Sequence, residues 1–126
     1  MFDHTPDRAS PATRALAFYL PQYHPVPEND AFWGPGFTEW RNVVQARPRF
    51  PGHDQPHLPA DLGFYDLRLP EARHAQALLA RAAGLHGFCY YHYWFSGRRL
   101  LHAPFDAVLA SGEPDFPSSL KLCHIN

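Results

Sequence analysis

The nine residues Gly87–Phe95, with the sequence GFCYYHYWF, constrain the fold more than any other part of the chain. Six of the nine are aromatic, a composition that suits a pleated strand, and no proline interrupts them. Side chains alternate between the two faces of a strand. One predicted face carries Phe88, Tyr90, His92 and Trp94, and the other carries Cys89, Tyr91, Tyr93 and Phe95. Neither face has the polar character of a solvent-facing strand. We therefore expect both faces to be covered, as in a parallel sheet flanked by helices.

Rings with polar tips are unusual for an interior strand, which more often carries valine, isoleucine and leucine. Tyrosine and tryptophan combine a flat apolar surface with a hydrogen-bonding group. This combination suits a surface that binds sugars. An aromatic core strand with internally satisfied hydroxyl groups is the alternative interpretation.

Two more strands and two helices are predicted around this segment. A short apolar run at 15–20 ends at Pro21, and a second run at 120–125 also has the character of a strand. The clearest helix runs from Pro70 toward Gly84, with proline at its first position and glycine at a left-handed stop. A shorter helix is predicted over 104–110. Two residues, Ser96-Gly97, turn the chain after the aromatic strand.

The first strand is followed by a long connection, residues 22–66, that is dense in proline, glycine and asparagine. Within it, 38–46 is predicted to form a short helix with Thr38 as its cap. Connections of this length are unusual in compact domains and are commonly functional.

Alternating strands and helices predict a parallel sheet with crossover connections. The first strand leads into LPQYHP rather than a glycine-rich phosphate loop, so a doubly wound sheet is disfavoured. The predicted fold class is therefore α/β, and specifically the amino-terminal part of a (β/α)8 TIM barrel. A complete barrel takes at least about 200 residues, so about three of its eight strands are expected in these 126 residues. Residues 1–14 are predicted to be a disordered leader and 15–126 the partial barrel domain.

Composition excludes several classes of protein. The chain has 11 basic and 12 acidic residues and no basic cluster longer than Arg98-Arg99, which argues against nucleic-acid binding. No apolar run approaches the roughly 20 residues of a membrane span. The two cysteines, Cys89 and Cys123, imply no disulfide framework. We expect a soluble, cytoplasmic protein.

Five longer runs are shared with a known family: AFYLPQYHPVPEND, WGPGFTEWRNV, RPRFPGHDQPHLPADLGFYDLR, GLHGFCYYHYWFSGRRLL and SGEPDFP. Together, from Ala15 to Pro117, they resemble the WbsX-like, glycoside hydrolase family 99-like proteins, which are often described as glycosyltransferases of lipopolysaccharide or polysaccharide synthesis. The resemblance implies a (β/α)8 barrel that acts on glycans without a metal or another cofactor. In related glycosidases the chemistry is endo-acting α-mannoside cleavage with retention.

After Pro117 the chain departs from the family pattern, which continues into Cys-Trp-Ala-Asn-Glu-Asn; here Ser118–Asn126 reads SSLKLCHIN. This departure is interpreted as a truncation or a shifted reading frame. The resemblance places the catalytic acidic pair further along the barrel. Glycoside cleavage generally needs two carboxyl groups about 5 Å or more apart, and no catalytic residue is assigned in this chain. The isolated chain is expected to be inactive.

Candidate sugar-contacting residues follow the predicted strands or lie among aromatic neighbours. His24 and His92 are expected near the carboxyl ends of the first two strands, where barrel enzymes build their sites. Glu39 lies between Phe37 and Trp40 and is a candidate for binding sugar hydroxyls, with a first-turn helix role as the alternative. Candidate platforms for sugar rings, each of which has a core role as its alternative, are Tyr19, Tyr23, Trp33, Trp40, Tyr91 and Trp94.

A metal site is not predicted, although the chain has nine histidines. His53 and His57 have the spacing of a zinc-binding helix, but Pro56 between them breaks such a helix. The predicted partner is a glycan substrate, processed most simply by glycoside hydrolysis. Glycosyl transfer in surface polysaccharide synthesis is the close alternative, and a non-catalytic sugar-binding remnant is the third. The oligomeric state stays open.

Overall fold

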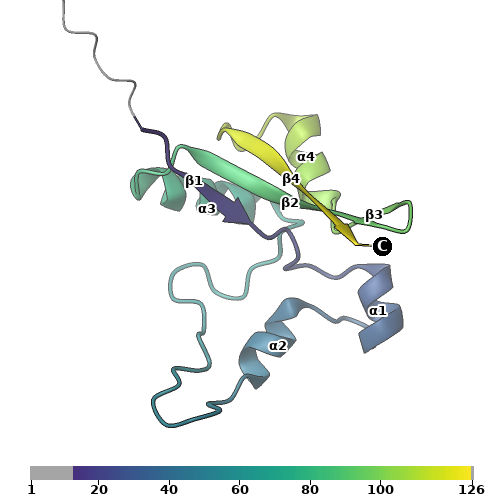
Figure 1. Cartoon of the computed structure of the whole chain (residues 1–126). Helices are drawn as coiled ribbons and strands as arrows, with labels where there is room; N and C mark the ends of the chain where they lie inside the picture. The colour runs from purple at the N-terminus through teal and green to yellow at the C-terminus, as the bar shows by residue number, and fades with distance from the viewer. Residues whose placement is uncertain (1–12, 126) are drawn as a thin grey trace, which may run out of the picture.

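The aromatic run forms the central strand of a four-stranded sheet (Figure 1). In the computed structural model, which describes residues 13–125, β2 (Gly87–Phe95) pairs in parallel with β1 (Leu16–Tyr19) and with β4 (Ser118–Ile125). These are the three strands expected from the sequence, and their parallel arrangement is confirmed. The fold is α/β, and its sheet is open at both edges in the described part of the chain. Its inclusion in a barrel stays a prediction.

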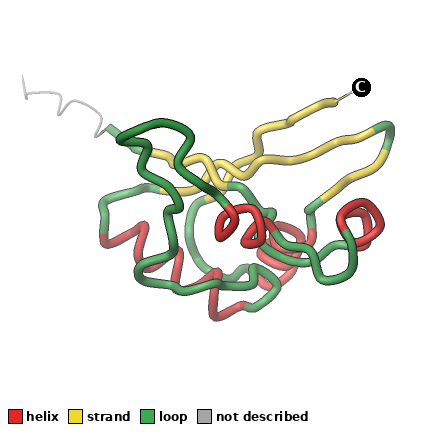
Figure 2. Tube along the Cα trace, turned by 90° about the horizontal axis from the view of Figure 1, so that it is seen from below, coloured by secondary structure: helices red, strands yellow, loops and turns green. Residues whose placement is uncertain are grey.

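Two helices connect the parallel strands. The chain runs from β1 to β2 through α3 (Pro70–Ala82), and from β2 to β4 through α4 (Ala103–Ser111). Helix α3 begins at proline, as predicted, and Gly84 beyond its end has the expected left-handed backbone, with φ 81°. The helices lie on one side of the strands (Figure 2).

The long connection after β1 contains two further helices. The predicted helix is present as α2 (Glu39–Gln45); Thr38 occupies the cap position, but its side chain makes no capping hydrogen bond. Helix α1 (Pro27–Trp33) lies in a stretch predicted to be irregular. Pro27 at its first turn and the acidic Glu28 and Asp30 favour this helix, although the turn formers around it hid the pattern.

A short antiparallel strand was also missed. β3 (Arg98–Leu100) folds back on the end of β2 through a hairpin whose two-residue loop is Ser96-Gly97. Both loop residues have positive φ, 43° and 81°. Such a turn matches the twist of the strands that flank it. The turn predicted at Ser96-Gly97 therefore joins β2 to β3 and does not lead directly into α4.

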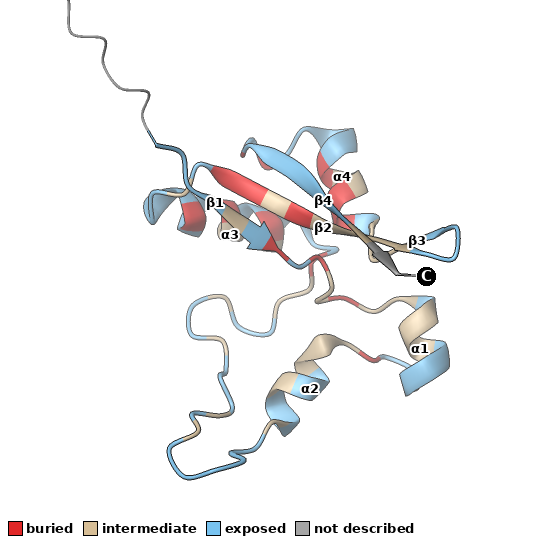
Figure 3. Ribbon diagram, viewed as in Figure 1, coloured by how far each residue is buried: buried red, intermediate tan, exposed pale blue. Residues whose placement is uncertain are grey.

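The hydrophobic core lies between the sheet and the helices (Figure 3). Phe88 and Tyr90 of β2 are buried, as the alternation of side chains predicts for one face of the strand. The Tyr90 ring lies 5.0 Å from Phe105 of α4, and the Phe88 ring lies 4.8 Å from Phe116. Burial of each aromatic side chain contributes about 1.5–3 kcal/mol. The core residues are Tyr19, Leu67, Ala77, Ala80, Phe88, Tyr90, Phe105 and Phe116.

The opposite face of the sheet is not covered by helices in residues 13–125, so the expectation that both faces are covered is wrong for this part of the chain. Phe18 on this face is 65% exposed. The Lys121 ammonium lies 4.7 Å from the centre of the Phe18 ring and 5.4 Å from that of Tyr91. A cation over two rings partly shields them from water. Cys89 and Cys123 are half-buried free thiols.

Candidate functional site

Beyond the carboxyl end of β1, Gln22 contacts Tyr93 near the end of β2, and Tyr23 contacts Trp40 at the start of α2. Glu39 lies near enough to both phenols to influence their pKa values. We call these five side chains the strand-end cluster: Gln22, Tyr23, Glu39, Trp40 and Tyr93. The Tyr93 hydroxyl donates a hydrogen bond to Gln22 Oε1 at 2.9 Å. The Tyr23 and Trp40 rings lie 4.4 Å apart at 47°. The cluster thus joins residues that are up to 71 positions apart in the sequence. The end of a parallel sheet is where open α/β folds and barrels place ligands.

Trp40 is held in a fixed orientation by its surroundings. Its indole Nε1 donates to the Tyr65 carbonyl oxygen at 2.8 Å, and its ring meets the Tyr65 and Phe64 rings edge-on at 4.9 Å and 5.3 Å. The backbone of Tyr23 is tied to the same loop, since the Leu67 N–H donates to the Tyr23 carbonyl at 3.1 Å. These contacts fix an aromatic surface at the strand ends in advance of any ligand.

The two phenols of the strand-end cluster stay protonated. Burial raises the pKa of Tyr23, and the nearby Glu39 carboxylate raises it further. Burial also raises the pKa of Tyr93, followed by the effects of Cys123, Tyr91 and then Glu39. Each hydroxyl can therefore donate a hydrogen bond at neutral pH, and that of Tyr93 already donates to the Gln22 amide oxygen.

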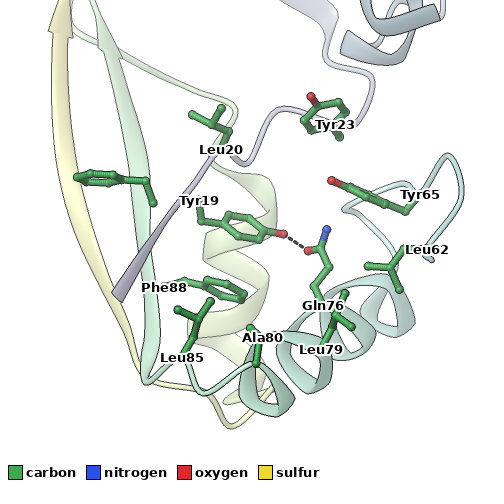
Figure 4. Close-up of a pocket in the computed structure, with 12 residues that line it drawn as sticks. Tyr19, Leu20, Tyr23, Leu62, Tyr65, Gln76, Leu79, Ala80, Leu85 and Phe88 are labelled. Carbon is green, nitrogen blue, oxygen red and sulfur yellow. Dashed lines mark hydrogen bonds between the residues drawn. The ribbon is translucent and has the colours of Figure 1, made fainter. Parts of the chain in front are cut away.

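A cavity of about 470 Å³ opens beside the cluster, between β1, α3 and the loop at 62–65 (Figure 4). Its lining is mainly apolar. The Tyr19 hydroxyl points to Gln76 and donates a hydrogen bond to its Oε1, while Tyr23 and Tyr65 stand together at one end (Figure 4). A second cavity of about 280 Å³ shares Tyr23 and Tyr65 and also contacts Trp40 and Asp61. The two cavities share Tyr23, Leu62, Tyr65 and Leu79. A mainly apolar lining with a few polar groups, as in the larger cavity, is typical of small-molecule sites.

Several residues predicted to contact sugar are brought together and others are not. Tyr23, Glu39 and Trp40 meet in the strand-end cluster. Tyr19 is buried in the core, where burial raises the pKa of its phenol, yet its ring also lines the larger cavity. Trp33 lies on α1, is 56% exposed, and stacks on Phe37 at 5.6 Å.

The residues predicted on β2 divide between its two faces. Tyr91 lies on the helix-free face. Its ring centre is 6.1 Å from that of Tyr93, on which it stacks, and 5.6 Å from that of Phe18. His92 and Trp94 belong to the opposite set of side chains, and their rings are 6.4 Å from each other. Tyr91 therefore does not share a surface with the other two.

His24 lies five residues beyond the end of β1, rather than directly after it as expected, and it is only 1% exposed. Neither ring nitrogen has a hydrogen-bond partner. Burial lowers the pKa of His24; Asp66 opposes this effect, while Arg68 and His102 reinforce it. The imidazole is neutral at neutral pH and faces a separate cavity, described below.

The sequence analysis did not select Gln22, Tyr65, Gln76 or Tyr93. Tyr93 could have been selected from the sequence, because side-chain alternation places it on the same strand face as the selected Tyr91. Tyr65 and Gln76 belong to a loop and a helix whose position against β1 depends on the fold. No local pattern identifies them.

Metal and membrane features are absent from the described residues. Among residues 13–125, no three histidine, cysteine, aspartate or glutamate side chains gather closely enough to hold a metal ion. No helix in the same range has both the length and the apolar character that a membrane crossing requires.

The fold and site thus define an α/β protein with tyrosine, tryptophan and amide groups gathered at the ends of parallel strands. The chain belongs to the WbsX family: a family model described as "Glycosyltransferase WbsX" matches residues 15–126. The resemblance to WbsX-like proteins predicted from the sequence motifs is therefore confirmed.

Two curated relatives come from strains B100 and ATCC 33913 of Xanthomonas campestris pv. campestris, and both are named "Uncharacterized protein WxcX". Each is 64% identical to this chain over 94 residues, which cover 75% of the chain and 13% of the relative. The chain therefore spans a small part of the length of these relatives. No solved structure matches the chain.

Proposed function

We propose that this chain forms the glycan-contacting amino-terminal part of a (β/α)8 barrel whose whole domain makes or breaks glycosidic bonds. The strand-end cluster carries the proposal, because its rings suit the apolar faces of a sugar and its hydroxyl, amide and carboxylate groups suit sugar hydroxyls. Membership in the WbsX family supports the same substrate class. The substrate is proposed to be a surface polysaccharide or a mannoside-type glycan, processed in the cytoplasm.

Two reactions fit this site. Glycosyl transfer agrees with the description of the family. Retaining hydrolysis agrees with the likeness to glycoside hydrolase family 99, but it needs two carboxyl groups about 5 Å apart. The strand-end cluster contains one carboxylate, Glu39. We therefore propose that either chemistry depends on acidic groups outside this cluster, and that the 126-residue chain by itself binds glycan without turning it over.

Glycan binding is tested by calorimetric titration of the chain with mannose oligosaccharides and with oligosaccharides from bacterial surface polysaccharide. Loss of the Trp40 ring in Trp40→Ala is expected to weaken binding at least about tenfold, which corresponds to about 1.4 kcal/mol. Tyr93→Phe keeps the ring and removes the hydroxyl, so it is expected to weaken binding by a smaller factor. Trp33→Ala, at the exposed Trp33 on α1, is the matched control and should change little. Equal loss in the control, or no binding by the parent chain, would reject the site.

The reaction is tested in a full-length WxcX relative, supplied with a labelled glycan in the presence and absence of a sugar acceptor. Release of reducing ends in water indicates hydrolysis. Product formation that requires the acceptor indicates transfer. Turnover by the purified 126-residue chain would contradict the proposal that this chain binds glycan without converting it.

A further inference from the structure

A separate cavity lies between the start of α1, the loop at 66–69 and the start of α4. Its volume is about 270 Å³, and His24, Glu28, Arg68, Arg99, His102 and Ala103 are among the residues that line it. Five buried side-chain nitrogen atoms in the described residues have no hydrogen-bond partner, and four of them belong to residues of this cavity: both ring nitrogens of His24, Arg99 Nε and His102 Nδ1. Buried polar groups are normally paired, so their concentration at one cavity indicates a missing partner.

The unpaired atoms include hydrogen-bond donors: Arg99 Nε–H and one N–H of the neutral His24 ring, whose other nitrogen is an acceptor. Arg99 binds Asp106 through Nη2, which leaves Nε–H without an acceptor, and a guanidinium group has no acceptor of its own. Helix α4 starts at the same place: His102 is its cap residue but makes no side-chain capping bond, and Ala103 is its first residue. The first N–H groups of a helix have no acceptor within the helix. The cavity therefore offers donors that an acceptor on a ligand could satisfy, although Pro104, the second residue of α4, has no N–H.

The charged residues at this cavity already balance one another. Arg68 pairs with Asp66 at 2.6 Å, and Arg98 pairs with Glu28 at 3.1 Å. Arg99 and Asp106 form the third pair. A cation would meet two arginines, Arg68 and Arg99, and no unpaired carboxylate. An oxyanion would meet the free Arg99 Nε–H, the N–H of the neutral His24 ring and the positive end of α4.

We infer that this cavity binds one small oxyanion group, a carboxylate or a phosphate, with His24, Arg99, His102 and the start of α4 supplying the hydrogen bonds. A volume of about 270 Å³ corresponds to roughly nine water molecules at about 30 Å³ each. That is enough for a phosphate group or for one acidic sugar unit. The inference does not rest on the proposed glycan site, because none of these residues belongs to the strand-end cluster.

The experiment uses the 126-residue chain with three probes at matched ionic strength: inorganic phosphate, D-glucuronate and uncharged D-glucose. Calorimetry should show saturable binding of phosphate, glucuronate or both, and none of glucose. Arg99→Gln and His102→Ala should each weaken binding at least about tenfold, since each removes a side chain proposed to hydrogen-bond the charged group. His24→Leu should abolish binding. Arg47→Gln, at an exposed arginine outside the cavity, is the matched control.

The relative affinities of phosphate and glucuronate identify the source of the oxyanion, and preference for either one supports the inference. Binding of glucose as tight as that of glucuronate would overturn it, because the cavity would then recognise hydroxyl groups. Absence of binding, or equal loss in Arg47→Gln, would also overturn it. If His24→Leu does not fold, Arg99→Gln and His102→Ala decide the outcome, since both positions are only half-buried. Failure of this site leaves the test of the strand-end cluster unaffected.

Discussion

At the scale of single residues, Gly87 shows how closely β2 approaches the backbone of Pro117, the residue before β4. Gly87 is buried at the start of β2, and its neighbour Phe88 donates its backbone N–H to the Pro117 carbonyl at 2.9 Å. A Cβ atom added at Gly87 would collide with that carbonyl oxygen, which is backbone and cannot rotate away. Glycine is required here for space rather than for an unusual backbone angle.

Gly87→Ala is therefore expected to destabilise the chain by about 1–3 kcal/mol, the usual cost of overpacking. Urea denaturation followed by circular dichroism measures the change. Ser119→Ala, at an exposed position of the neighbouring strand, is the control and should lie within about 0.5 kcal/mol of the parent. A Gly87→Ala variant as stable as the parent would show that the loop at Pro117 can move.

His24 makes stability depend on pH in a defined direction. Its folded-state pKa is lowered from 6.5, chiefly by burial. Well above pH 6.5 the imidazole is neutral in both folded and unfolded states, and the chain has its full stability. As the pH falls below 6.5, the unfolded chain takes up a proton that the folded chain does not, so stability decreases. The maximum slope is about 1.4 kcal/mol per pH unit for one group.

We expect His24→Leu to flatten the dependence of the unfolding free energy on pH between neutral pH and the folded-state pKa. His74→Leu, at an exposed histidine of α3, should keep the slope of the parent. The measurement is urea denaturation at several pH values in phosphate-free buffer, so that no oxyanion stabilises the folded state. A slope that survives in His24→Leu would assign the dependence to another group.

At the scale of elements, the hairpin between β2 and β3 depends on two residues with positive φ. Gly97 adopts φ 81° without strain, whereas Ser96 at φ 43° has a side chain in the left-handed region. Asparagine tolerates this region better, and Asn-Gly is the preferred pair for such a turn. Ser96→Asn should therefore raise stability by about 0.5 kcal/mol, and Ser96→Val should lower it by about 1 kcal/mol.

Thermal melting of the two variants beside the parent tests this interpretation. Their effects should have opposite signs, and both should leave glycan binding unchanged because Ser96 lies outside the strand-end cluster. Two destabilised variants would indicate that the Ser96 side chain has a role other than closing the turn.

The elements that the sequence predicted correctly are those whose pattern is local. The alternation within β2 and the proline-to-glycine limits of α3 each follow from a few neighbouring residues. Helix α1 and strand β3 were missed because their stability comes from context: α1 is a seven-residue helix among turn formers, and the three residues of β3 pair only because the hairpin returns them to β2. Short elements of this kind have little intrinsic stability.

The strand-end cluster was predicted in part for the same reason. Residues a few positions after a strand, such as Tyr23, can be placed from sequence, because the ends of parallel strands lie at one edge of the sheet. Gln22 and Tyr93 could be joined only once the register of β1 against β2 was known. The sequence places His24 near the end of β1, but its burial and its unpaired nitrogens depend on the loop at 66–69 and on α4.

At the scale of the whole molecule, the described sheet has an unpaired strand edge and exposed apolar side chains that no described residue covers. Strand β4 pairs with β2 on one side only in the described residues, and Leu120 and Leu122 on β4 are 48% and 65% exposed. The helix-free face exposes Phe18 and Leu16 as well. Open strand edges next to apolar side chains favour pairing with another chain.

We expect the isolated chain to associate as its concentration rises toward about 100 μM, with an average mass above the 14.4 kDa of one chain. A charge on the exposed edge should oppose this pairing. Leu122→Lys should therefore return the mass toward that of a monomer. Leu109→Lys is a closely matched control, since Leu109 on α4 is 64% exposed but lies away from the strand edge. Light scattering after size-exclusion chromatography measures both.

Leu122→Lys and Leu109→Lys distinguish pairing at the strand edge from non-specific hydrophobic association, because each replaces one exposed leucine by one lysine. If both lower the mass equally, exposed apolar surface as such causes the association. If the parent chain is monomeric at every concentration, neither the open edge nor the helix-free face drives association. In that case the Lys121 contacts with the Phe18 and Tyr91 rings would be sufficient to protect the helix-free face from other chains.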